Sequence, residues 1–207
     1  MQSTITTAAK PPRERAAAIV SLISAVAGAG ALLAHAPAAA QQPSTTATSR
    51  EPISVVKEFL ENTAPDKVGA AAKRLVAPDA TYVSLNFSNP ELQKIEPWAG
   101  TSQGPEGFSN TFARVATYWK IEDFRVTDIF GTGENVAVFG RFTYRSVAVG
   151  TTFTSPFSIL AKVKGGKIVY FQFMEDTYAS AASFRQSGSW TVKTDPNAPA
   201  FKVGKTE

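Results

Sequence analysis

A series of runs in which apolar and polar side chains alternate, between residues 121 and 176, most constrains what this chain can fold into. Alternation of this kind is typical of strands that bury one face and expose the other. Gly165-Gly166 lies between two such runs and fits a two-residue hairpin turn. We therefore expect a meander of long antiparallel strands, with segments over 121–130, 136–149, 151–164 and 168–176.

Helical periodicity replaces this alternation in the region before the strands. Apolar residues recur every three or four positions, which predicts one helix from residue 51 and a second that follows Asp66 and runs to about Leu75. A strand over 80–87 follows, and Pro105-Glu106 suits the first turn of a third helix, whose apolar stripe includes Phe112 and Trp119. Three helices that precede an antiparallel meander predict an α+β fold.

The first forty residues predict a cleaved signal peptide rather than part of the fold. Basic residues precede an apolar stretch over 16–34, and Ala38-Ala39-Ala40 supplies the small side chains of a cleavage site. An uncleaved membrane anchor is the alternative, because the stretch is about long enough to span a bilayer. We expect an exported protein, periplasmic or secreted, that meets the membrane only through this peptide during export.

Composition narrows the chemistry that the mature protein can perform. The chain has no cysteine, and its single histidine, His35, leaves with the signal peptide. Thiol nucleophiles, Ser-His-Asp triads and histidine- or cysteine-based metal sites are thereby excluded. Loss of three basic residues and one acidic residue lowers the formal net charge from +4 to +2, so the charge gives no reason to expect nucleic acid as a partner. Proton transfer would depend on Asp, Glu, Tyr, Lys or water.

Two segments flank the expected domain. Residues 41–50 are rich in Ser, Thr and Pro and predict a flexible leader. The domain itself is expected to cover residues 51–184 and to close with a short helix over 177–184. Residues 185–207 form a C-terminal extension, with a candidate extra strand over 189–194 and an end that we expect to be frayed.

Short motifs near the last strands resemble a known family. Gly166-Lys167-Ile168 and Met174-Glu175-Asp176-Thr177, in this order after the helices, look like the SnoaL-like branch of the nuclear-transport-factor-2-like superfamily. Ketosteroid isomerases, limonene epoxide hydrolases and polyketide cyclases belong to it. The resemblance covers residues 51–184 and implies a curved sheet folded around the helices into a cone with an internal pocket, often dimeric through the sheet. It implies no single reaction, because the fold hosts enzymes and non-enzymes alike.

One acidic residue carries the catalytic hypothesis. Asp176 matches an acidic position at the end of the last strand that points into the cone in several relatives, although it could instead cap the following helix or pair with an arginine. Alternation places Asp176 opposite Glu175, and the sequence leaves open which face lines the pocket. The other residues expected to line the pocket are Tyr82, Trp98, Phe112, Tyr118, Arg141, Tyr144, Gln172 and Met174.

Three functions follow from these features. The first is an exported protein that binds a small, largely apolar molecule in a conical pocket. The second is a carboxylate-dependent isomerase, cyclase or hydrolase, in which Asp176 would be the base and a tyrosine the oxyanion donor. The third is a non-catalytic module that forms a homodimer. None of the three calls for a cofactor or a metal, and a small molecule is the expected ligand.

Overall fold

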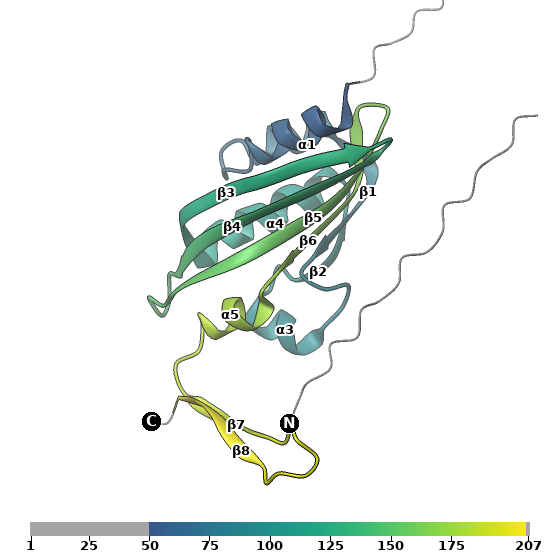
Figure 1. The fold of residues 1–207 in the computed structure, drawn as a ribbon. Coiled ribbons are helices and arrows are strands. Elements are labelled where there is room, and N and C mark those ends of the chain that lie inside the picture. Colours follow the sequence, from purple (N-terminus) through teal and green to yellow (C-terminus); the bar gives the residue numbers. More distant parts are fainter. Residues whose placement is uncertain (1–49, 206–207) are drawn as a thin grey trace, which may run out of the picture. The chain divides into compact units, whose positions relative to one another are not determined.

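The computed structural model describes residues 50–205, so the expected signal peptide and nearly all of the leader lie outside the described residues. Helices α1 (Pro52–Leu60) and α2 (Val68–Leu75) precede the first strand, β1 (Val76–Ser84). Helix α3 (Pro90–Ile95), strand β2 (Gly100–Gln103) and helix α4 (Gly104–Tyr118) follow. Figure 1 shows their arrangement.

The expectation of three N-terminal helices is wrong. Four helices precede β3 in the described part of the chain, and only two of them precede the first strand. The additional helix, α3, lies between the expected strand over 80–87 and the expected third helix. There the Asn89 side chain accepts a hydrogen bond from the Leu92 backbone N–H at 3.1 Å. Pro90 at the first helical position completes this start. Trp119, placed on a helical stripe by the sequence, begins β3 instead.

A mixed sheet of six strands has the order β2-β1-β6-β5-β4-β3. Its long strands are β3 (Trp119–Thr132), β4 (Asn135–Ser146), β5 (Thr152–Lys164) and β6 (Lys167–Glu175). These four form the antiparallel meander expected from the alternation, and β1 joins β6 in parallel. The sheet is therefore mostly antiparallel and curved, and the fold class is α+β as predicted.

The hydrophobic core lies between the helices and one face of the sheet. Helices α1 and α4 run along the same face in Figure 1. Strand β4 buries Val136, Val138, Phe142 and Tyr144, as its alternation predicts. At the centre, Phe59 of α1 meets Phe108 of α4 and Phe171 of β6 with ring centroids 5.9 and 5.7 Å apart. We call these three fully buried rings the aromatic cluster.

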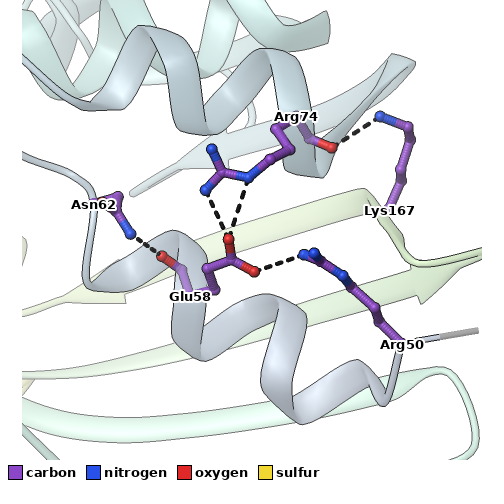
Figure 2. Close-up of polar contacts among 5 residues, drawn as sticks. All are labelled: Arg50, Glu58, Asn62, Arg74 and Lys167. Atoms are coloured by element: carbon purple, nitrogen blue, oxygen red, sulfur yellow. Dashed lines mark hydrogen bonds and ion pairs between the residues drawn. The ribbon is translucent and has the colours of Figure 1, made fainter.

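Polar contacts at the surface attach α1 to α2 and α2 to β6. In Figure 2, the Glu58 carboxylate of α1 lies between Arg50 and Arg74, with a nitrogen–oxygen distance of 2.7 Å to each. The Lys167 ammonium of β6 donates to the Arg74 backbone carbonyl at 2.9 Å. Because these side chains are partly exposed, water screens the ion pairs and each contributes at most about 1 kcal/mol. Packing of the apolar faces therefore holds the helices, and the ion pairs refine their position.

The chain continues past β6 with more structure than the sequence indicates. Helix α5 (Thr177–Ala182) follows β6 directly, and a separate hairpin pairs β7 (Gly188–Val192) with β8 (Phe201–Lys205). The expectation of a strand near residues 189–194 is confirmed. The expected frayed end is wrong for residues 201–205, because this segment pairs with β7.

Candidate functional site

A small cavity lies between the helices and the concave face of the sheet, next to the aromatic cluster. Its volume is about 60 Å³, room for a handful of water molecules. Most of its wall is aromatic, and the polar side chains that reach it include those of Tyr82, Ser84, Tyr144 and Glu175. A cavity that is mostly apolar with a few convergent polar groups is the usual form of a small-molecule site.

Strand geometry decides which carboxylate of β6 reaches this cavity. Phe171, Phe173 and Glu175 alternate onto the concave face, and Glu175 and Phe173 line the cavity. Asp176 follows the strand, and its backbone N–H donates to the Ser155 hydroxyl at 2.9 Å. This bond fixes the end of β6 against β5, which holds the Glu175 side chain on the inner face.

Burial makes Glu175 a weak acid. Removal from water, together with repulsion from the nearby Glu96 carboxylate, raises the pKa of its carboxyl to about 8. The Ser180 hydroxyl of α5 acts in the opposite direction. One oxygen of the Glu175 carboxyl, Oε1, is buried and finds no hydrogen-bond partner among the described residues. Glu175 therefore changes its charge near neutral pH, where a general acid or base is most effective.

Glu96 is the second buried carboxyl of this region. Its backbone N–H closes the last turn of α3 on the Leu92 carbonyl at 2.7 Å, and its own carbonyl accepts from Ala99 at 2.9 Å. The side chain is 0% exposed, and neither carboxyl oxygen has a hydrogen-bond partner within residues 50–205. Burial raises the pKa of Glu96 to about 7. We call Glu96, Glu175 and the intervening Ser180 the carboxyl cluster.

Two phenols of the cavity wall complete the set of proton donors. Burial raises the pKa of both Tyr82 and Tyr144 above the ordinary value, so each stays protonated across the neutral range. Trp98 and Trp119 cover another part of the wall with ring centroids 4.7 Å apart. The Trp119 indole N–H donates to the Ser183 hydroxyl at 2.9 Å, which ties α5 to the start of β3.

Four of the eight residues expected to line the pocket do so: Tyr82, Trp98, Phe112 and Tyr144. Tyr118 is 40% exposed and does not line the cavity, although its ring centroid lies 5.4 Å from that of Trp98. Arg141, Gln172 and Met174 are wrong as members of the cavity wall, because the pleat of β4 and β6 turns them to the opposite face of the sheet from Phe142, Phe171 and Glu175. Met174 lines an outer groove instead.

Asp176 does not line the cavity either. Its exposed carboxylate accepts a hydrogen bond from the Ala179 backbone N–H at 3.0 Å, so it caps α5. Capping of the following helix is one of the two structural roles that the sequence left open for Asp176. The candidate carboxylate is its neighbour Glu175, which the same alternation placed with Phe171 and Phe173. Glu96 was missed altogether, and the one indication in the sequence is an acidic residue within an apolar loop, next to Pro97-Trp98.

Two further observations describe residues 50–205. No helix among them is both long and apolar enough to cross a membrane. No three of their His, Asp or Glu side chains are grouped as metal ligands.

Comparison with known proteins identifies the family. A family model described as the SnoaL-like domain matches residues 56–171. "Patulin synthesis protein F" of Aspergillus clavatus is 46% identical over 143 residues, which cover 68% of this chain and 72% of that protein. "Patulin biosynthesis cluster protein F" of Penicillium expansum is 42% identical over 146 residues, which cover 69% and 73%.

Solved structures share the fold at lower identity. An NTF2-like protein from Burkholderia thailandensis superposes with a TM-score of 0.57 at 22% identity, covering 66% of this chain and 99% of that one. The chain therefore belongs to the family of SnoaL-like domain proteins, with the nuclear-transport-factor-2-like fold.

Proposed function

We propose that this protein is an acid–base enzyme that acts on a small, largely apolar molecule, with Glu175 as the group that moves the proton. The observation that carries the proposal is a buried carboxyl at the wall of an apolar cavity, beside a second buried carboxyl. Burying carboxyl groups without hydrogen-bond partners is unfavourable for folding. Such an arrangement is typical of catalytic sites, where a carboxyl needs a pKa near the working pH.

The cavity supplies the parts that a proton transfer needs. The ionised Glu175 carboxylate would remove a proton from carbon or oxygen of the bound molecule, and the protonated form would return it elsewhere. Negative charge that develops on a substrate oxygen would be stabilised by the phenol O–H groups of Tyr82 and Tyr144, both of which border the cavity. Glu96 does not border it, and would act by setting the charge of Glu175. Isomerisation, cyclisation and hydrolysis all fit this chemistry.

The relatives support an enzyme of small-molecule synthesis. Two proteins at 46% and 42% identity carry names that refer to patulin synthesis. Their matches extend over more than two thirds of this chain, so the comparison concerns the whole cone domain and not one motif. By this likeness we propose a substrate of the same general kind, a small product of secondary metabolism.

A generic proton-transfer probe tests the assignment of Glu175. The compound 5-nitrobenzisoxazole loses its C3 proton to a carboxylate base, its N–O bond breaks, and the oxygen leaves with the electron pair as a coloured phenolate. We expect the protein to accelerate this reaction and Glu175→Gln to reduce kcat/KM by about 10²–10⁴-fold. In the unmodified protein kcat/KM should rise with pH through about 8, since the base must be ionised.

Asp176→Asn is the matched control, because it removes the adjacent carboxylate on the other side of the strand. This variant should keep the activity within about twofold. Loss of activity in Asp176→Asn but not in Glu175→Gln would reverse the assignment. A protein that binds the probe but does not turn it over would be a carrier, and the enzyme proposal would fall.

We also propose that the protein is exported, with cleavage after Ala40. The support is the charged, apolar and small-residue pattern of residues 1–40 alone. N-terminal sequencing of the protein recovered outside the cell should start within about two residues of Gln41. An intact Met1 in a membrane fraction would contradict cleavage.

We further propose that the outer face of the sheet forms a homodimer. Phe130 and Phe139 stack on this face with ring centroids 5.9 Å apart although both are exposed, and Leu160 and Met174 are exposed on the neighbouring strands. Exposed apolar side chains that adjoin one another are typical of an interaction surface. Sedimentation equilibrium should give twice the chain mass for the unmodified protein and a monomer for Phe139→Lys.

A further inference from the structure

A larger groove lies outside the cavity, between α3 and α5. Its volume is about 670 Å³, compared with about 60 Å³ for the inner cavity. Leu92 and Ile95 of α3 form one side, and Tyr178 and Ala181 of α5 form the other. The inner cavity is too small to enclose a substrate larger than a few atoms without movement of the wall. The groove has the volume of a typical small-molecule site.

The groove and the cavity share part of their walls. Leu85 and Glu175 border both, so a single layer of side chains separates the two spaces. Leu85 has a backbone φ of 66°, a conformation that is unfavourable for a branched side chain, and its N–H donates to the Phe173 carbonyl at 2.9 Å. Held in this way at the end of β1, Leu85 turns away from the strand and closes the cavity beside Glu175.

A residue from outside the family match completes the groove. Trp190 of β7 lines it, and the SnoaL-like match ends at residue 171. The indole is 56% exposed, yet its position is defined by two contacts. Its centroid lies 5.8 Å from that of Tyr178 in an edge-to-face arrangement, and the Arg185 guanidinium lies 5.6 Å from the ring.

We propose that the groove between α3 and α5 binds the apolar body of an elongated ring-containing substrate whose reacting end reaches Glu175, and that Trp190 is a specificity-determining residue. The inference rests on the proposed function, since it assigns the rest of the ligand to the same site. A flat indole face at the groove and a carboxyl at its inner end favour a molecule with an aromatic or unsaturated ring. Trp190 contributes to binding the substrate, and it contributes nothing to the proton transfer.

Two probe compounds report separately on ligand binding in the groove and on proton transfer by Glu175. N-phenyl-1-naphthylamine is neutral, elongated and fluorescent when it leaves water, so it reports on the groove. The elimination of 5-nitrobenzisoxazole reports on Glu175. We expect Trp190→Ala to weaken binding of the naphthylamine about tenfold, because the ligand loses the aromatic face on which it stacks. The same variant should keep kcat for the elimination within about twofold.

A control and a competition experiment complete the test. Phe201→Ala removes another exposed aromatic ring from the same hairpin, one that does not line the groove, and should leave both readouts unchanged. Because the groove continues to Glu175, the naphthylamine should inhibit the elimination competitively. Unchanged naphthylamine binding in Trp190→Ala, or binding without competition, would overturn the groove assignment. Neither result would affect Glu175, whereas an active Glu175→Gln would overturn the proposed function and leave the groove result standing.

Discussion

The aromatic cluster and two members of the carboxyl cluster, Glu96 and Ser180, are buried to the same degree, and burial affects the stability of the fold in opposite ways in the two groups. Phe59, Phe108 and Phe171 are each 0% exposed, and so are Glu96 and Ser180. In the first group burial stabilises the fold, since every buried ring removes apolar surface from water and contacts other rings. In the second group it is unfavourable, because carboxyl oxygens lose water and gain no partner among the described residues. Equal burial therefore identifies a structural region in one case and a functional region in the other.

The largest expected loss of stability comes from a substitution in the aromatic cluster. Phe59→Ala should lower the free energy of unfolding by about 3–5 kcal/mol, because a fully enclosed ring leaves a cavity that its neighbours cannot fill. Phe112 packs on Phe59 with centroids 5.6 Å apart but borders the existing cavity, so Phe112→Ala should cost less. Urea denaturation of both variants measures the difference. Equal losses would show that the two rings are equally enclosed.

A change in stability of intermediate size, which depends on pH, is expected from a substitution in the carboxyl cluster. Burial raises the pKa of Glu96 from its ordinary value of 4.5 to about 7, so the folded protein binds this proton more tightly than the unfolded chain. The stability associated with it is fully present below about pH 4.5 and is lost as the pH rises through about 7. Stability measured at pH 8 should therefore be higher in Glu96→Gln than in the unmodified protein, once the difference between the two at pH 4.5 is subtracted.

The size of this gain is about 3 kcal/mol, because one pKa unit corresponds to about 1.4 kcal/mol. Glu91→Gln is the control, since Glu91 lies in the helix that Glu96 ends and its side chain is 83% exposed. Thermal melts of the two variants and the unmodified protein at pH 4.5, 6 and 8 measure this gain. A difference between Glu96→Gln and the unmodified protein that does not change with pH would show that Glu96 is solvated in the folded state.

The smallest effect concerns the helix cap beside the carboxyl cluster. Asp176→Ala removes the acceptor for the Ala179 N–H and should cost about 1 kcal/mol of stability. Elimination activity should stay within about twofold, because the carboxylate is exposed and does not border the cavity. Asp195→Ala, which removes a similar side-chain bond from Asn197 N–H in the loop between β7 and β8, should cost less since no helix depends on it. A large loss of activity in Asp176→Ala would return this residue to the site.

Much of the fold could be predicted from local patterns, and the site only in part. The alternation of β4 and β5 identified their buried faces, because a strand with one buried face leaves little freedom. The β6 segment has apolar residues on both faces, Phe171 and Phe173 inward and Met174 outward, so alternation alone could not say whether Glu175 or Asp176 points inward. Contacts with β5 and α5 decide it.

Glu96 shows a different limit of prediction from sequence. It lies just after α3, whereas Glu175 lies at the end of β6, and the two positions are far apart in the chain. No spacing rule connects such positions, because α3 has no periodic stripe long enough to reveal its inner face. Of the β7–β8 hairpin, the sequence predicted only the first strand, for a related reason. Trp190 lies in a short alternating run, whereas β8 contains Gly204 and two lysines in only five residues.

The three tryptophans differ in exposure, so their fluorescence distinguishes the cavity wall from the groove. Trp98 and Trp119 are 5% and 2% exposed at the cavity wall, whereas Trp190 is 56% exposed at the groove. Emission from the first two should be blue-shifted and shielded from a dissolved quencher such as acrylamide, and emission from the third should be red-shifted and quenched. The chain has only these three tryptophans, so Trp190→Ala leaves a protein whose whole indole signal comes from the cavity wall. Ligand entry would then be visible as a colour change of the protein itself, with no label attached.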